Sequence, residues 1–228
     1  MNFLIKESAK KPILMSVLMF GLTLFGMGAV SLSQAQTFSL TSTSIQSGQT
    51  LSYSNPSDQK FFLNIKSFGC EGGNVSPALS WSNAPQNTQS FVITFRDEDA
   101  PTGSGFWHGL IYNIPASVVQ LNESSLGEIF SKANATTGLI ENSANTNVNN
   151  IAYASINSSG GRSFLGMCPP SGRTHNYVYK IYALKNNLTD NAAKGFLGGS
   201  GALTSFVNLF ANKDNILASA ELRFKASR

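Results

Sequence analysis

The chain has 228 residues and a formal net charge of +4. Without residues 1–35, which hold three lysines and one glutamate, the charge falls to +2. The remaining Lys and Arg residues form no cluster, which argues against a nucleic-acid-binding surface. Residues 36–228 are long enough for one domain with its own hydrophobic core.

Residues 1–35 have the order of a secretory signal peptide. Three lysines precede an uncharged, largely apolar run over residues 12–30, and the small residues Ser33 and Ala35 follow it. This order predicts cleavage near Ala35 and an exported protein, periplasmic or secreted. The run also approaches membrane-spanning length, so the alternative is a membrane anchor formed by residues 12–30.

Most of the remaining chain has the pattern of β-strands. Apolar and polar residues alternate, with many β-branched and aromatic side chains, and Gly, Pro and Asn turns separate the runs. We expect strands at residues 37–45, 61–65, 90–95, 106–114, 176–184 and 219–226.

Two other segments break this pattern. Residues 120–163 are rich in Asn, Ser and Gly and have weak periodicity, which predicts a long surface excursion beside or over the core. Residues 202–212 carry apolar side chains at helical spacing and predict a helix. We therefore expect a mainly β fold in a single domain over residues 36–228, with antiparallel sheets packed together, a C-terminal helix and few short helices.

Three acidic residues directly follow one expected strand. Asp97, Glu98 and Asp99 stand just beyond residues 90–95, on a loop that the sheet would hold in place. In extended backbone Asp97 and Asp99 share one side, and Glu98 points away. Such a junction can be a solvated turn, or it can supply carboxylates to a site.

Both histidines of the chain begin apolar strands. His108 lies within residues 106–114, and His175 directly precedes residues 176–184. A buried imidazole is costly unless its ring nitrogens have partners. Two imidazoles and a carboxylate could bind a metal, act as acid and base, or bind a small anion. No short His spacing supports a metal, and no Gly-x-Ser-x-Gly motif marks a hydrolase nucleophile.

Cys70 and Cys168 are the only cysteines. In an exported protein an even number of cysteines fits a single disulfide. That bridge would close a loop of about 100 residues, worth about 4 to 5 kcal/mol in the chain-entropy treatment. The alternative is two free buried thiols.

Three stretches together resemble the bacterial branch of the phosphatidylethanolamine-binding proteins, also called Raf kinase inhibitor proteins. "RDEDAPTGSGFWHGLIYNIPA" resembles the family's Asp-Pro-Asp-Ala-Pro … Trp-His … Asn-Ile-Pro signature, and "CPPSGRTHNYVYKIYAL" resembles its second block. "GCEGGNVSPALSWSNAPQNTQSFVITF" is similar to the segment before the signature. The resemblance runs from about residue 61 to residue 184.

The resemblance implies a central antiparallel β fold with a small pocket for anions such as phosphate or phosphorylated head groups. The residues that match the family's pocket are Asp97, His108, Pro170, His175 and Tyr177. Three more match supporting positions, namely Asp99, Pro101 and Trp107. A bridge between Cys70 and Cys168 would tie two loops to the pocket rim.

The sequence departs from the family at three positions. Glu98 and Met167 stand where proline is usual, and Asn176 stands where arginine is usual. Glu98 is expected to point away from the pocket, so its effect should be small. Asn176 lacks the guanidinium that would pair with a carboxylate, so whatever that arginine orients must be held otherwise.

The implied pocket places an anion beside Asp97. The ligand should therefore keep a proton to share with this carboxylate, while the two histidines donate N–H groups from the other side. Phosphate binding is then expected to weaken above about pH 7.

Three functional hypotheses follow. The first is an exported, non-catalytic module that needs no cofactor, binds phosphate or a phosphorylated head group, and can modulate another protein. The second is a secreted effector or inhibitor of a protein kinase or protease that acts through the pocket rim. The third is a hydrolase with His108 or His175 as its base, for which the sequence designates no nucleophile. None of them involves nucleic acid, and membrane contact would come only through the signal segment or a lipid head group.

Overall fold

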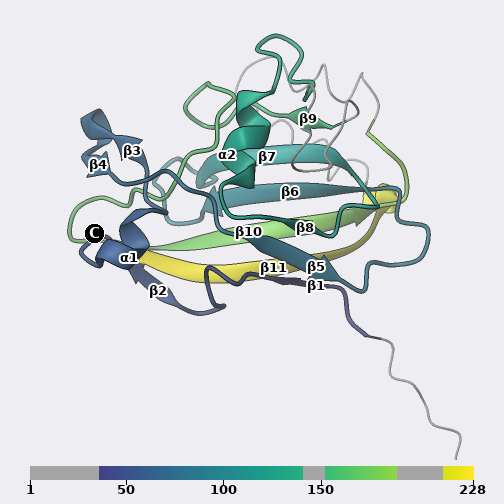
Figure 1. Ribbon diagram of the computed structural model, residues 1–228, viewed down its shortest axis with the longest axis horizontal. Coiled ribbons are helices and arrows are strands. Elements are labelled where there is room, and N and C mark those ends of the chain that lie inside the picture. Colours follow the sequence, from purple (N-terminus) through teal and green to yellow (C-terminus); the bar gives the residue numbers. More distant parts are fainter. Residues whose placement is uncertain (1–35, 141–151, 189–212) are drawn as a thin grey trace, which may run out of the picture. The chain divides into compact units, whose positions relative to one another are not determined.

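A six-stranded sheet runs through the middle of the fold in the computed structural model (Figure 1). The structure describes residues 36–140, 152–188 and 213–228. Neighbouring strands are antiparallel except β2 and β11, which are parallel. In spatial order the strands are β2 (Thr50–Ser52), β11 (Ile216–Ser227), β10 (Thr174–Leu184), β6 (Ser90–Asp97), β7 (Phe106–Pro115) and β9 (Tyr153–Ala154).

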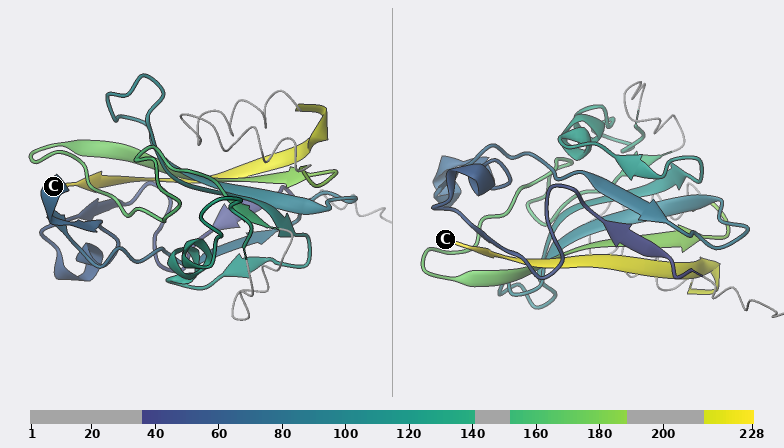
Figure 2. Two further views of the ribbon diagram at one scale, coloured as in Figure 1. Left: turned by 90° about the horizontal axis from the view of Figure 1, so that it is seen from above. Right: turned by 60° about the horizontal axis from the view of Figure 1, so that its bottom comes forward.

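Two smaller sheets and short helices complete the described part. One sheet has the order β1 (Ser39–Thr41), β5 (Leu79–Ser82) and β8 (Gln120–Leu121), and the other pairs β3 (Asn64–Ile65) with β4 (Cys70–Glu71). The helices are α1 (Pro56–Gln59) and α2 (Ser125–Ser131), with 3-10 turns η1 (Lys66–Phe68) and η2 (Lys213–Asn215). Figure 2 shows α2 and the three-stranded sheet on one side of the six-stranded sheet.

The main core lies between these layers, and strand β6 supplies its centre. Phe91, Ile93 and Phe95 point into the main core, whereas Val92 belongs to a second apolar cluster with Leu110. A strand that is covered on both faces has a nearly continuous apolar sequence rather than an alternating one. Strand β11 alternates instead, because only one of its faces is buried along its second half.

The predicted fold class is confirmed: the protein is mainly β, with sheets packed together and short helices. Four expected strands appear as β6, β7, β10 and β11, each extended by one or more residues, namely those at residues 90–95, 106–114, 176–184 and 219–226. The expected strand at residues 37–45 is only β1, and that at residues 61–65 is only β3, because turns interrupt both. The expected signal segment and the helix at residues 202–212 lie outside the described residues.

The described part of the expected excursion at residues 120–163 contains regular elements that pack on the core. This part forms β8, α2 and β9, and α2 buries Leu126, Ile129 and Phe130 in the main core. These three side chains recur at i, i+3 and i+4, which is the signal of a helix with one apolar face. The polar residues around these three positions hide the helix signal in the sequence.

Among the described helices, none is long and apolar enough to cross a membrane.

Candidate functional site

Three strand ends bring the expected site residues together. The end of β6 pairs with the start of β10 and with the start of β7, so Asp97 lies opposite Tyr177 on one side and Phe106 on the other. Gly105, in the turn before β7, has φ +78°, and a side chain there would clash with the carbonyl oxygen of Asp97. The turn between β6 and β7 therefore needs a glycine to fold closely over Asp97.

A cavity of about 420 Å³ opens at this end of the sheet. Five expected residues line it, namely Asp97, Pro101, His108, Pro170 and His175. Most of the other lining residues are apolar, among them Leu63, Phe68, Phe106 and Leu165. A mostly apolar hollow with a few convergent polar groups has the general form of a small-molecule site.

Asp97 is fixed by hydrogen bonds at the base of the cavity. Its Oδ1 accepts the backbone N–H groups of Asp99 and Ala100, at 2.9 and 3.1 Å. Its Oδ2 lies 2.8 Å from Nδ1 of His175, and both side chains are almost fully buried. As a carboxylate, Asp97 accepts the Nδ1–H of His175, which leaves Nε2 as the free ring nitrogen of that histidine.

His108 presents an acceptor, not a donor. Its Nδ1 lies 3.0 Å from the carbonyl oxygen of Leu165, which can only accept, so Nδ1 carries the proton. The side chain is only 5% exposed. Burial lowers its pKa to about 4, although the charge of Asp97 and the carbonyl of Leu165 act in the opposite direction. His108 is therefore neutral near pH 7, and its Nε2 is a hydrogen-bond acceptor. The expectation that both histidines donate to a ligand is wrong for His108.

Tyr177 packs against His108, which lines the cavity, but does not line the cavity itself. Its side chain is buried, and its ring centroid lies 5.5 Å from that of His108 and 5.8 Å from that of Phe95. Burial and the nearby Asp97 carboxylate raise the pKa of the Tyr177 hydroxyl well above its usual range, so it stays protonated. This aromatic packing fixes the plane of the His108 ring.

Trp107 and Glu98 lie on the opposite face of the sheet. Trp107 stands between Phe106 and His108 on β7, and successive side chains of a strand alternate in direction. Its ring lies 5.1 Å from the guanidinium of Arg96, outside the cavity. Trp107, expected at a supporting position, therefore does not line the cavity, whereas the expected outward direction of Glu98 is confirmed.

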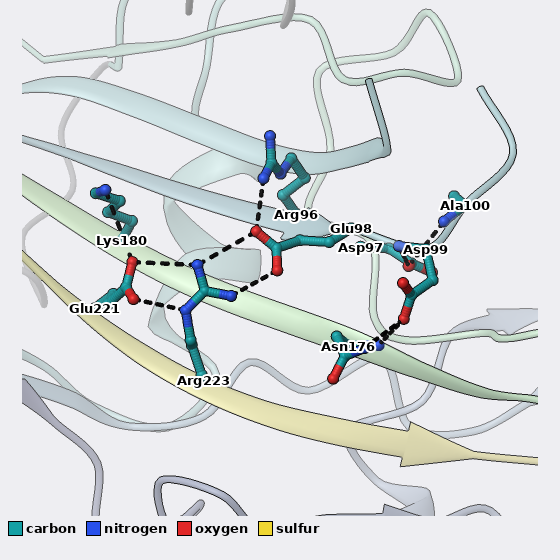
Figure 3. Close-up of polar contacts among 9 residues, drawn as sticks. All are labelled: Arg96, Asp97, Glu98, Asp99, Ala100, Asn176, Lys180, Glu221 and Arg223. Carbon is teal, nitrogen blue, oxygen red and sulfur yellow. Dashed lines mark hydrogen bonds and ion pairs between the residues drawn. The ribbon is translucent and has the colours of Figure 1, made fainter. Parts of the chain in front are cut away.

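Glu98 forms an ionic cluster on that outer face. Arg96 and Arg223 each donate to its carboxylate at 2.6 Å, and Figure 3 shows the three side chains meeting there. Burial raises the pKa of Glu98, but the hydrogen bonds and charges of the two arginines outweigh it and leave the pKa below its usual value. The cluster links the end of β6 to β11 and so steadies the strand end that carries Asp97.

Asn176, which stands where arginine is usual in the family, holds Asp99. Its backbone N–H and side-chain Nδ2 donate to Oδ2 of Asp99 at 2.6 and 2.7 Å (Figure 3). Asp99 thus supports the turn, as expected, without lining the cavity. The third departure, Met167, is buried and donates its backbone N–H to the carbonyl oxygen of Phe61, a bond that proline could not make.

Replacing Asn176 by alanine should lower the free energy of unfolding by about 1 kcal/mol, because it removes one hydrogen bond to a carboxylate. Urea unfolding measures the change. Lys225→Ala is the matched control, since Lys225 lies directly opposite Asn176 on β11 and is exposed. Equal losses in the two variants would show that the Asn176 amide does not hold Asp99.

Cys70 and Cys168 form a disulfide, so the alternative of two free thiols is wrong. Their Cα atoms lie 6.1 Å apart, and the bridge joins β4 to the loop before Pro170. Cys168 itself lines the cavity. Since no other cysteine exists, the oxidised protein has no thiol nucleophile.

Sequence reasoning missed several lining residues. Phe106 could have been found, because residues two apart on a strand share a face, and Phe106 stands two positions before His108. Its ring lies 4.9 Å from the imidazole. Leu165 and Arg228 have no local signal, since each reaches the cavity from a distant part of the chain. Within the described residues, no group of three His, Cys, Asp or Glu side chains could hold a metal ion.

Comparisons with known proteins agree on one family. The family model described as phosphatidylethanolamine-binding protein matches residues 41–227. The UPF0098 protein YbcL of Escherichia coli is 37% identical over 191 residues, which cover 83% of this chain and 87% of YbcL. A second Escherichia coli relative, YbhB, is 33% identical over 138 residues, 60% of this chain and 75% of YbhB.

Solved structures share the fold. The crystal structure of Escherichia coli YbcL, described as a new member of the mammalian PEBP family, aligns with a TM-score of 0.61 at 33% identity, covering 84% of this chain and 98% of that one. The structure of the putative homologue CT736 from Chlamydia trachomatis aligns with a TM-score of 0.54 at 22% identity, covering 84% and 97%. The second likeness concerns the fold alone.

Proposed function

Because the chain belongs to the phosphatidylethanolamine-binding protein family, we propose that its cavity binds a phosphate monoester in the form that carries one negative charge. The observation that supports this is the arrangement of Asp97, His108 and His175 at the base of the cavity. We propose binding rather than catalysis, since neither the sequence nor the cavity designates a nucleophile.

The two histidines would take different parts. His108 offers the lone pair of Nε2 and so needs a ligand that brings its own proton, such as a P–OH group. His175, when protonated, presents Nε2–H to a phosphate oxygen, and Asp97 stabilises the resulting positive charge. In this arrangement the ligand shares its proton with His108 rather than with Asp97. That carboxylate already accepts from Asp99, Ala100 and His175.

Phosphoethanolamine should bind about tenfold more weakly, or worse, at about pH 8 than at about pH 5.5, because phosphate monoesters lose their second proton near pH 6. Calorimetry at the two pH values measures this. A phosphodiester, which has no P–OH group, should bind weakly at both. Equal affinity at the two pH values would contradict the proton requirement.

The same titrations with His175→Ala should show a loss of about tenfold, the usual cost of a charge-assisted hydrogen bond. Lys180→Gln is the control, because Lys180 lies on the outer face of the sheet near Glu221 and outside the cavity. If Lys180→Gln lost as much affinity as His175→Ala, the phosphate would bind on the outer face instead.

We also propose that the protein is exported. The disulfide supports this, since such bonds persist in oxidising compartments. Mass spectrometry of the protein from fractionated host cells would reveal cleavage near Ala35, or a retained anchor.

A second candidate function is binding of a protein partner through the pocket rim. The observation in its favour is Phe68, which lines the cavity and is 58% exposed. Aromatic residues, Phe among them, are enriched at protein interfaces.

A further inference from the structure

Arg228 brings a permanent positive charge to the cavity. It follows β11 and lines the cavity beside Phe68 and Cys168. It is the one Lys or Arg among the described lining residues, and it has no counterpart in the motifs of the sequence. The exposed side chain of Phe68 marks this part of the lining as the rim.

The guanidinium of Arg228 is held in place by hydrogen bonds that one of its nitrogens, Nη1, donates. Nη1 donates to the carbonyl oxygens of Phe68 and Gly69, at 3.1 and 2.8 Å. It also lies 3.2 Å from Sγ of Cys70 and 3.5 Å from Sγ of Cys168. Gly69 has φ +76°, and a Cβ there would lie 3.0 Å from Nη1, so the glycine leaves room for the guanidinium.

These contacts fix the side chain without neutralising it. In the described part of the chain, no carboxylate pairs with Arg228, whereas Arg96 and Arg223 both pair with Glu98. Of the five N–H donors of a guanidinium, those on Nε and Nη2 make no hydrogen bond to described residues. A guanidinium with a free edge is a geometry that suits a carboxylate or a phosphate.

The cavity therefore has polar groups from two sources, the strand ends and the residue after β11. Asp97, His108 and His175 come from the strand ends, Arg228 follows β11, and apolar side chains such as Leu165 and Phe106 line the cavity as well. A volume of about 420 Å³ fits a small organic molecule, whereas an inorganic ion would leave much of it unfilled.

We propose that Arg228 is a specificity-determining residue that binds a carboxylate elsewhere on the ligand. The ligand class is then a phosphate monoester joined to a carboxylate through a short apolar spacer. This inference rests on the proposed function, because the phosphate is taken to lie at His108 and His175.

Calorimetry with two matched series of probes tests the proposal on the full chain at about pH 6. At this pH about half of the phosphate monoester molecules still carry the second proton. One series is alkyl phosphates of increasing chain length, and the other is the same molecules with a terminal carboxylate. At the best length the carboxylate should raise affinity about tenfold, as expected for charge-assisted hydrogen bonds. Arg228→Gln should remove this gain, so that the two series bind alike, and Arg228→Lys should retain part of it.

Three other outcomes would refute the proposal. If alkyl phosphates bind but the carboxylate brings no gain at any length, the role of Arg228 is refuted and the phosphate site stands. If Arg228→Gln weakens both series equally, Arg228 only supports the rim, and the proposal fails. If no probe of either series binds, the proposed function fails and this inference with it.

Discussion

Replacing both Cys70 and Cys168 by alanine should lower the free energy of unfolding by about 4 to 5 kcal/mol. The bridge joins residues that are 98 positions apart in the chain. Without it the unfolded chain gains the entropy of a long open loop, and the native state gains nothing comparable. Such a loss is a large part of the stability of an ordinary domain.

Urea unfolding at neutral pH, with and without a thiol reductant, measures this loss. The reduced wild type should unfold close to the double variant, and the reductant should leave the double variant unchanged. If the variant fails to fold, the reduced wild type alone provides the comparison. A decrease below about 1 kcal/mol in both would mean that the bridge merely joins loops that are already held together, since loop closure predicts much more.

Ligand binding in the cavity should also weaken when the disulfide is removed. The bridge ties β4, next to the η1 turn that carries Phe68, to the loop that carries Pro170, and Arg228 contacts both sulfur atoms. Opening it would free the rim while leaving Asp97 and His175 in the sheet. Loss of ligand selectivity at the rim is therefore expected before loss of phosphate binding.

The local parts of the site could be predicted from the sequence. Alternation along an extended strand placed Asp97 and Glu98 on opposite sides, because side-chain direction depends only on neighbouring residues. The same rule assigns Trp107 to the outer face, because it stands between Phe106 and His108, which both lie on the inner face. The resemblance gave its position in the motif without its direction.

The remaining features depend on contacts between distant segments. Arg228 reaches the cavity because β11 pairs with β10 along its whole length, a register that no local pattern contains. The role of His108 as an acceptor depends on the carbonyl oxygen of Leu165, 57 residues away. A histidine can be recognised in a sequence, but its tautomer is set by its partner.

The neutral state of His108 has a measurable consequence for stability. Its pKa in the folded protein is about 4, against an ordinary value of 6.5. Between these two pH values the unfolded chain binds a proton at His108 that the folded protein does not, so lowering the pH favours unfolding. The difference corresponds to about 3 kcal/mol, fully present near pH 4 and absent above about pH 7.

His108→Gln should remove this pH dependence, because glutamine does not titrate. Urea unfolding of both proteins from about pH 7 to about pH 4 should show the wild type losing about 3 kcal/mol more than the variant, since the carboxylates titrate equally in both. Near-ultraviolet circular dichroism at neutral pH would verify that the variant is folded. Parallel pH curves would mean that His108 takes up its proton in the folded state. Its Nε2 would then be a donor in acid, and the requirement for a protonated ligand would not hold there.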